Sequence, residues 1–140
     1  MVILGIGLFL IGVKNLVAPT PRQIVRRHVG ASPSPGGSVR IQETKGAGFF
    51  AGSETFLSFR VESNAFHRIV REKHFGEIRG PFFRDNINTP WWFDGVRSQS
   101  VGYIRLSTNR WFFVGPRRRH AEFLCRDENN NAFYCRTWAQ

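Results

Sequence analysis

The clearest structural pattern in the chain is Thr55-Phe-Leu-Ser-Phe-Arg-Val-Glu62, followed at once by Ser63-Asn-Ala-Phe-His-Arg-Ile-Val-Arg-Glu-Lys-His-Phe-Gly76. Its first half alternates apolar and polar residues, which is typical of a strand with one buried face and one solvated face. In the second half apolar residues recur at helical spacing, Ser63 can cap the helix, and Gly76 can end it. The stretch therefore predicts a strand followed directly by the central helix of a domain, whose core positions are Phe66, Ile69 and Val70.

Shorter strand signals lie on both sides of this unit. One strand is expected over residues 39–43, before the glycine-rich loop at residues 46–52. Beyond the aromatic-rich loop at residues 77–100, further strands are expected over residues 101–107, 111–114, 121–127 and 132–138. Sequential strands joined by short turns favour antiparallel pairing. We therefore expect an α+β domain over residues 39–140, with one helix packed on an antiparallel sheet of about five to six strands.

An uncharged apolar run begins the chain at Val2 and ends before Lys14. At about 1.5 Å per helical residue it must extend to Ala18 to approach a bilayer core of about 30 Å. Its glycines are common in membrane helices. The run predicts a transmembrane anchor over residues 1–18, with a buried globular helix or a signal peptide as the alternatives. The residues assigned to this anchor are Val2, Ile3, Leu4, Ile6, Leu8, Phe9, Leu10, Ile11 and Val13.

A second, short helix is predicted from Pro21 to Val29. Thr20 and Gln23 form a capping box, Pro21 suits the first helical position, and Gly30 supplies the stop. The helix is amphipathic, which is typical of a basic segment at the lipid interface; in the alternative interpretation its apolar side covers the core of the domain. The apolar side holds Ile24, Val25, His28 and Val29, and the basic side holds Arg22, Arg26 and Arg27. Two prolines and two glycines within residues 31–38 predict a linker between this helix, over residues 19–30, and the domain.

Cys125 and Cys135 are the two cysteines of the chain. If Asn129–Asn131 forms the turn of a hairpin, they face one another across two strands, which predicts a disulfide; two buried thiols are the alternative. A disulfide places the domain on the extracytoplasmic, periplasmic side of the membrane. The basic residues that follow the apolar run favour the cytoplasmic side instead, and we give the cysteine geometry slightly more weight.

Trp91-Trp92-Phe93 is the most informative surface candidate. Adjacent aromatic side chains point in different directions, so all three do not enter one core. At least one is expected in a contact with another chain or the lipid interface, where tryptophan and arginine are common anchors; the alternative is a lid over the end of the sheet. Arg117, Arg118 and Arg119 are either a docking patch or a solvated turn.

Other motif matches do not support a catalytic or metal site. Gly46, Gly48 and Gly52 miss the dinucleotide-binding spacing, and the calcium-loop-like start at Asp127 has Ala132 where a glycine is required. The helix from Ser63 aligns three polar residues on its outer face, where solvation is the expected reason for them: His67, Arg71 and His74. The carboxylates show no pairing that would set up general acid and base roles, and no recognisable nucleophile motif or close Cys-x-x-Cys pair is present. We therefore expect no enzyme activity, no metal and no cofactor.

The formal net charge of +10 predicts attraction to anionic headgroups, nucleic acid or acidic proteins. Together with the apolar run, it favours a non-catalytic, single-pass membrane accessory subunit. Its expected partners are other membrane-protein subunits of a larger complex, such as a respiratory, photosynthetic or secretion assembly, and anionic lipid headgroups. A basic nucleic-acid-binding α+β protein is the alternative, although no RNA-binding signature accompanies the basic residues.

Overall fold

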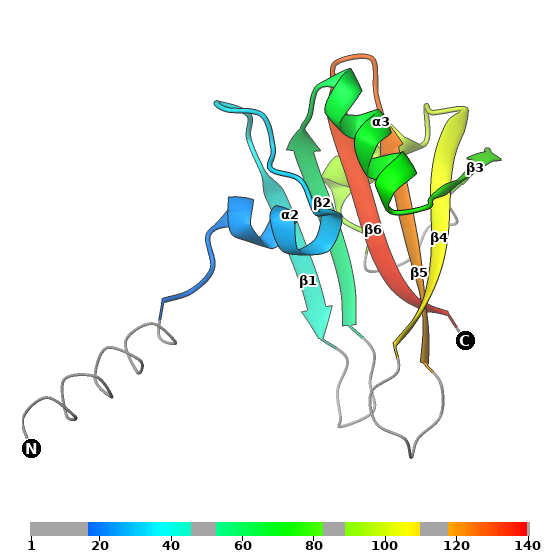
Figure 1. Cartoon of the computed structure of the whole chain (residues 1–140), viewed down its shortest axis with the longest axis horizontal. Coiled ribbons are helices and arrows are strands. Elements are labelled where there is room, and N and C mark those ends of the chain that lie inside the picture. The colour runs from blue at the N-terminus through cyan, green and yellow to red at the C-terminus, as the bar shows by residue number, and fades with distance from the viewer. Residues whose placement is uncertain (1–16, 46–52, 83–88, 110–117, 140) are drawn as a thin grey trace, which may run out of the picture.

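A computed structural model describes residues 17–45, 53–82, 89–109 and 118–139. Its centre is a six-stranded antiparallel sheet in the order β1-β2-β6-β5-β4-β3 (Figure 1). The expected α+β class and antiparallel sheet are therefore confirmed. The strands are β1 (Arg40–Lys45), β2 (Ser53–Arg60), β3 (Gly76–Arg79), β4 (Val101–Asn109), β5 (Arg118–Arg126) and β6 (Asn131–Ala139).

The strands form two units that join in the middle of the sheet. β1 and β2 are an antiparallel pair, and β3 to β6 follow one another as neighbours; β2 pairs with β6, with Phe56 opposite Cys135, to complete the sheet. The helix α3 (Ser63–Glu72) carries the chain from β2 across one face to β3 at the far edge (Figure 1). The last strand, β6, therefore lies at the centre of the sheet, between β2 and β5.

The strand β3 differs from the sequence expectation. Gly76 is expected to end the helix, but α3 ends at Glu72 and Gly76 begins β3. The turn between them uses a positive φ of 56° at His74, and the cap residue before α3 is Glu62 rather than Ser63. A four-residue strand is too short for its alternation to stand out from loop sequence. The predicted strand at residues 111–114 and the loop at residues 46–52 lie outside the described residues.

The sheet has a core on each face, because neighbouring residues of a strand point to opposite sides. Phe56 and Leu57 of β2 illustrate this, since they belong to different clusters. One face is covered by α3 and by the helix α2 (Pro21–Val29), and the other is covered by the 3-10 helix η1 (Trp91–Val96). We call the first cluster the helix-side core; it comprises Val25, Val29, Leu57, Phe59, Val61, Phe66, Ile69, Phe75, Leu124, Ala132 and Tyr134. The second, the reverse-side core, comprises Phe56, Phe93, Val96, Cys125, Phe133 and Cys135.

α2 forms with the predicted boundaries and caps. The Thr20 side chain accepts from the backbone N–H of Gln23, the Gln23 side chain accepts from the backbone N–H of Thr20, and Gly30 adopts a left-handed conformation with φ of 82°. Its apolar side does not face away from the domain: Val25 and Val29 are buried in the helix-side core. The expected interfacial helix is therefore part of the globular domain, as in the alternative interpretation, because an amphipathic pattern fits a protein core as well as a lipid surface.

The expected linker at residues 31–38 is also held against the domain. Pro33 is buried, and the backbone N–H of Ser34 donates to the carbonyl of Arg60 over 2.8 Å. Ala31 packs against the helix-side core. Proline and glycine exclude regular structure here, but they do not exclude tertiary contacts, so this segment packs on the sheet and α3 instead of only connecting α2 to them.

The residues of the proposed anchor, from Val2 to Val13, lie outside the described part of the chain. Among the residues that the structure describes, no helix is long and apolar enough to cross a membrane.

Candidate interaction surface

The aromatic triplet at residues 91–93 forms the first half of η1, and each residue has a different environment. Trp91 is 77% exposed, Trp92 is half-buried and Phe93 is 1% exposed. Phe93 is buried in the reverse-side core, and Trp92 packs against that core. These two residues therefore cover the sheet, whereas Trp91 lies on the surface. One tryptophan of the triplet is exposed, and its contact with a partner stays a prediction.

η1 is held rigidly on the sheet. The Phe93 ring meets Phe56 edge-on at a centroid distance of 5.3 Å and Phe133 at 5.7 Å. Behind it, Gly95 lies so close to Phe133 that a Cβ atom at residue 95 would come within 2.8 Å of the ring. The next turn is closed by a hydrogen bond from the Ser98 hydroxyl to the Gly95 carbonyl and by an ion pair between Asp94 and Arg97 at 3.4 Å. The backbone that carries Trp91 is therefore fixed by its buried neighbours.

Trp91 has a close cationic neighbour on β1. The guanidinium carbon of Arg40, the first residue of β1, lies 5.4 Å from the centroid of the indole ring. Arginine stacks on aromatic faces through its planar cation. The pair joins η1 to an edge strand of the sheet and presents an aromatic surface beside a positive charge. We call Arg40 and Trp91 the Arg40–Trp91 pair.

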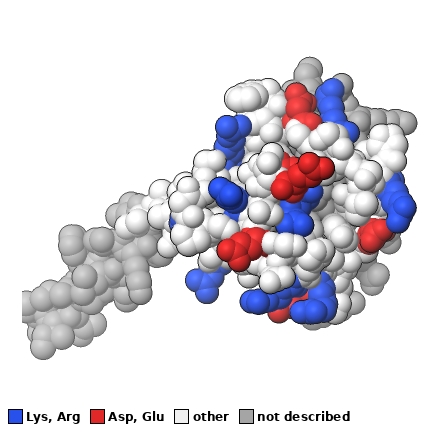
Figure 2. Space-filling model, turned by 90° about the horizontal axis from the view of Figure 1, so that it is seen from above, with Lys and Arg blue, Asp and Glu red and all other residues white. Residues whose placement is uncertain are grey.

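The predicted basic contacts are partly described. Arg22, Arg26 and Arg27 are exposed on α2. Arg118 and Arg119 belong to β5, where their backbones pair with Asn109 and Thr108 of β4, but their side chains and the whole of Arg117 lie outside the described part. Over the face seen in Figure 2, basic and acidic side chains are interspersed rather than gathered into one basic patch.

The structure contradicts the expected disulfide. Cys125 and Cys135 are both free and buried. Cys125 is opposite Phe133, and Cys135 is opposite Phe123, so the two cysteines are diagonal neighbours on the same face. Such neighbours are about 7 to 8 Å apart, which is longer than the usual span of a disulfide.

The register of the β5–β6 hairpin explains this error. The Asp127 carboxylate accepts from the backbone N–H groups of Asn129 and Asn131, at 2.9 Å and 2.8 Å. This turn is centred on Asn129, one residue earlier than expected, and Asn130 takes a positive φ of 63°. Moving the centre by one residue moves the strand partners by two. The same contacts occupy Asp127 within the turn, and no group of metal ligands occurs among the described residues.

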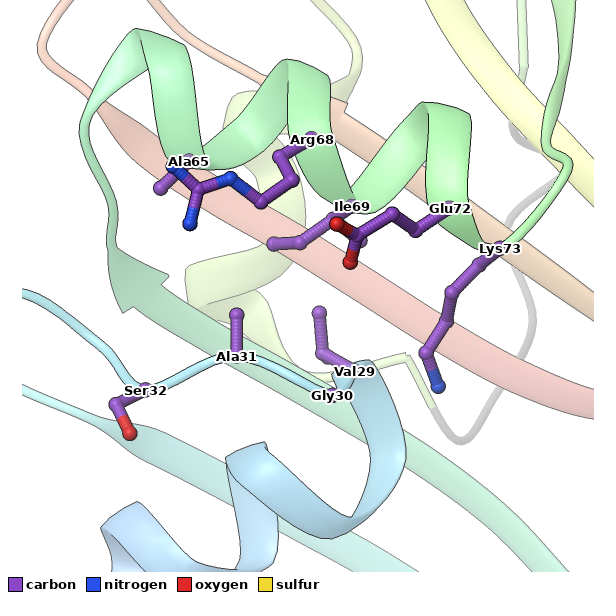
Figure 3. A pocket seen from close by; sticks show the side chains of 9 residues that line it. All are labelled: Val29, Gly30, Ala31, Ser32, Ala65, Arg68, Ile69, Glu72 and Lys73. Atoms are coloured by element: carbon purple, nitrogen blue, oxygen red, sulfur yellow. The ribbon is translucent and has the colours of Figure 1, made fainter.

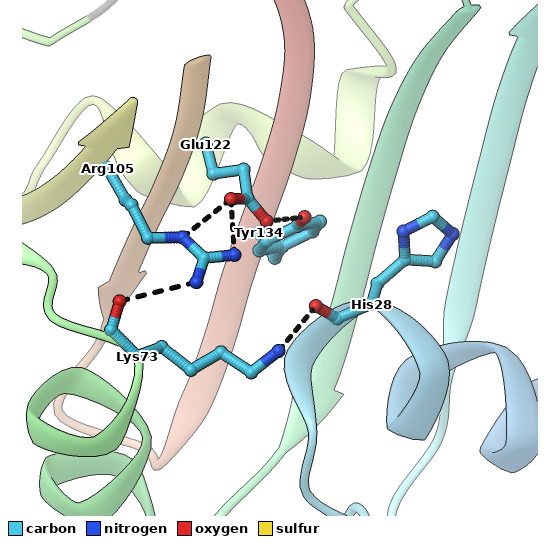
Figure 4. Close-up of polar contacts among 5 residues, drawn as sticks. All are labelled: His28, Lys73, Arg105, Glu122 and Tyr134. Carbon is cyan, nitrogen blue, oxygen red and sulfur yellow. Dashed lines mark hydrogen bonds and ion pairs between the residues drawn. The ribbon is translucent and has the colours of Figure 1, made fainter. Parts of the chain in front are cut away.

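A buried polar network lies beneath α2 and α3, on the helix side of the sheet (Figure 4). Glu122 of β5 is 3% exposed and accepts hydrogen bonds from Arg105 of β4, at 2.7 Å, and from the Tyr134 hydroxyl of β6, at 2.6 Å. Arg105 also donates to the Lys73 carbonyl, and the Lys73 ammonium donates to the His28 carbonyl over 3.4 Å. The network therefore links three strands to the C-terminal ends of both helices.

The protonation chemistry of this network favours a structural role. Burial, reinforced by the hydrogen bond to Glu122, raises the pKa of Tyr134 far above its usual range. Burial lowers the pKa of Lys73, with a further contribution from Arg105. Burial also lowers the pKa of His28, against the opposing effect of Glu43, whose carboxylate is 3.5 Å from its Nε2 atom. Because the Glu122 carboxylate is already bound by two neighbours, it is poorly placed to act as a general base.

The three polar residues expected on the outer face of the central helix are solvent-exposed. His67, Arg71 and His74 are exposed on or just beyond α3. Sequence reasoning missed Arg40 and the network of Arg105, Glu122 and Tyr134. Their sequence signal is weak, because the strand face that carries Glu122 also holds the polar His120 beside the apolar Leu124. The partners of Glu122 depend on the register of the strands.

Comparison with known proteins adds no assignment. No family model, curated protein or solved structure matches this chain.

Proposed function

We propose that this chain is a non-catalytic, single-pass membrane accessory subunit that binds other membrane-protein subunits and stabilises a larger assembly. The observation that carries the proposal is the Arg40–Trp91 pair. Trp91 is 77% exposed, although the two residues that follow it pack into or against the reverse-side core. An exposed tryptophan on a fixed backbone loses little conformational freedom when it is buried by a partner.

The neighbouring cation supports a protein contact in particular. Tryptophan and arginine are enriched among the residues that dominate protein interfaces. Here the guanidinium of Arg40 lies 5.4 Å from the ring centroid of Trp91, so both groups can enter the same contact. The partner that fits this pair offers an apolar pocket for the indole and a carboxylate for the guanidinium.

Membrane attachment is proposed from the sequence and from the position of α2. The apolar run of Val2–Val13 supplies the anchor, and only residues 14–20 separate it from α2. Because α2 packs on the domain, such a short connection would hold the domain close to the bilayer. Its exposed arginines, Arg22, Arg26 and Arg27, would then attract anionic headgroups, at about 1 kcal/mol for each residue near the surface.

The side of the membrane is proposed on charge alone. The extracytoplasmic expectation depended on a disulfide, and the cysteines are free. The remaining sequence cue is the series of basic residues after the apolar run: Lys14, Arg22, Arg26 and Arg27. By the positive-inside rule these favour a cytoplasmic domain.

The nucleic-acid alternative has less support. Binding of single strands uses several aromatic side chains as a stacking platform. Among the described side chains of phenylalanine, tyrosine and tryptophan, only that of Trp91 is largely exposed. The charges on the face of Figure 2 are mixed, whereas a nucleic-acid groove requires a continuous basic surface.

Co-purification tests the proposal. The tagged full-length chain is extracted from its own membranes in mild detergent, and the accompanying proteins are quantified for wild type, Trp91→Ala and Leu106→Ala. Leu106 is the matched control, since it is 65% exposed and lies on β4, on the other side of the sheet's centre from β1. We expect Trp91→Ala to keep the melting temperature and lose defined membrane-protein partners, while Leu106→Ala keeps them. Retention of every partner by Trp91→Ala, or release of the wild-type chain from membranes by carbonate, would contradict the proposal.

A further inference from the structure

A second surface feature is separate from the Arg40–Trp91 pair. A cleft of about 360 Å³ lies between α3 and the segment that leaves the C-terminal end of α2 (Figure 3). This volume is within the range of about 300 to 1,000 Å³ that is usual for small-molecule sites. Its apolar lining comes from both sides: Val29 and Ala31 from the α2 side, and Ala65 and Ile69 from α3.

Three charged side chains of α3 and its C-terminal cap stand around this apolar lining. Arg68, Glu72 and Lys73 extend from α3 toward the Gly30–Ser32 backbone (Figure 3). Arg68 and Glu72 are exposed, and no ion pair joins any two of the three in the described part of the structure. The guanidinium of Arg68 therefore keeps its fork of donors available for a carboxylate or a phosphate.

Lys73 is held at one end of the cleft. Its stem passes over Gly30, where a Cβ atom would lie 2.7 Å from the lysine Cε atom, and its ammonium reaches the His28 carbonyl at 3.4 Å. Gly30 also has a φ of 82°, which a side chain rarely tolerates. A glycine at residue 30 thus serves two purposes: it ends α2, and it leaves room for a cation to lie against the cleft.

From this arrangement we infer that the cleft binds a small amphipathic monoanion, which places an apolar body on Ala31, Ala65 and Ile69 and one acidic group on Arg68. Lys73 adds a second positive charge. Glu72 lies between the two cations in sequence, and its negative charge repels a second negative charge on the ligand. A carboxylate or a phosphodiester, with one negative charge, therefore fits better than a dianionic phosphate. A free short-chain acid and a lipid headgroup share this chemistry.

Methyl NMR of the full-length chain in phosphatidylcholine nanodiscs tests the inference. Two soluble probes separate the sources: hexanoate for a free acid, and dihexanoyl phosphatidylglycerol for a lipid phosphodiester, each compared with empty nanodiscs. We expect at least one probe to shift the methyl signals of Ala31, Ala65 and Ile69 in a saturable way. The probe that binds with the higher affinity identifies the source of the ligand. Acetate, which lacks the apolar body, should bind at least about tenfold more weakly.

Variants decide whether the cleft itself is responsible. Arg68→Gln should weaken binding about tenfold, as is typical for loss of a charge-assisted hydrogen bond. Arg71→Gln is the matched control, because Arg71 is an exposed arginine of α3 that does not line the cleft. The variant Glu72→Gln lacks the negative charge that repels a dianion. It should therefore reduce the ratio of the affinity for hexanoate to the affinity for dianionic hexyl phosphate at pH 8.

Three results would overturn the inference. One is the absence of saturable shifts at the three methyl groups with either probe. Another is an equal loss of affinity in Arg68→Gln and Arg71→Gln, which would indicate general attraction to a basic surface. The third is equal binding of acetate and hexanoate, which would remove the role of the apolar lining. None of these outcomes bears on the co-purification test, so the two proposals fail independently.

Discussion

The hydroxyl oxygen of Tyr134 lies 2.6 Å from Oε1 of Glu122, and this hydrogen bond joins β6 to β5 beneath both helices. Arg105 reaches the other carboxylate oxygen from β4, so one buried carboxylate connects three strands. A buried charge is tolerated only when paired and hydrogen-bonded. The carboxylate of Glu122 meets both conditions, and it fixes the surface on which α2 and α3 pack.

The first prediction concerns this network. Tyr134→Phe removes one hydrogen bond but leaves the pair of Glu122 and Arg105, and should lower the free energy of unfolding by about 1 to 2 kcal/mol. Glu122→Gln should cost more, because it leaves the Arg105 guanidinium without its counter-ion. Urea denaturation of the full-length chain in one detergent measures both. An equal or smaller cost of Glu122→Gln would contradict the expectation that the lost counter-ion is the larger penalty, and a negligible cost would show that the ion pair adds no stability.

The second prediction is a pH dependence that arises from His28. Burial lowers its pKa in the folded state below the ordinary histidine value of 6.5, while Glu43 opposes the shift and Arg136 and Arg27 reinforce it. The unfolded chain then binds the proton more readily, so stability is fully present above about pH 6.5 and falls as the pH drops toward the folded-state pKa. The variant His28→Gln should reduce the dependence of the melting temperature on pH between about pH 7.5 and 5.5. An unchanged slope in the variant would assign the dependence to other groups.

The third prediction concerns the two thiols. Burial is the main cause that raises the pKa of both Cys125 and Cys135 to about 12. Because the thiolate is the reactive form, neither should react with a thiol reagent in the native protein at pH 8. Both should react in denaturant without any reductant. If the reagent labels no thiol in denaturant until a reductant is added, Cys125 and Cys135 form a disulfide. The hairpin register described above is then wrong.

The fourth prediction tests whether α2 belongs to the domain. Val25 is completely buried, whereas its neighbour Arg26 is exposed on the same helix. Val25→Ala should lower the free energy of unfolding by about 1 to 2 kcal/mol, because it leaves a cavity in the helix-side core. Arg26→Ala should change it by less than about 0.5 kcal/mol. Thermal unfolding of both variants in parallel distinguishes a packed helix from one that only rests on lipid, for which the two changes would be equally mild.

Local chemistry accounts for what could be predicted. The capping box of Thr20 and Gln23 and the stop at Gly30 bounded α2 correctly, since these contacts involve residues a few positions apart. Alternation located β2, and helical spacing placed Phe66 and Ile69 of α3 in the core. The class of the fold followed from these elements.

Two of the failures depend on partners far away in the sequence, and one depends on a shift of a single residue within a local turn. The apolar side of α2 could cover lipid or protein, and only the packing of Val25 decides between them. The hairpin register depends on two hydrogen bonds of Asp127, so a shift of one residue at the turn separated Cys125 from Cys135. An exposed aromatic residue within the triplet at residues 91–93 was anticipated, but the sequence did not show that it is Trp91. Its Arg40 partner comes from a strand far away in the sequence.

Photo-crosslinking from residue 91 in intact membranes shows directly whether Trp91 contacts another membrane-protein subunit. A photoreactive phenylalanine analogue replaces Trp91 in the full-length chain, and a second variant carries it in place of Leu106, which is also exposed. The proposed function predicts a discrete cross-linked product between residue 91 and another membrane-protein subunit, and a weaker or absent product from residue 106. If the membranes yield no protein adduct from residue 91, or the same adducts from both residues, Trp91 is not the anchor of an interface and the proposed function is contradicted.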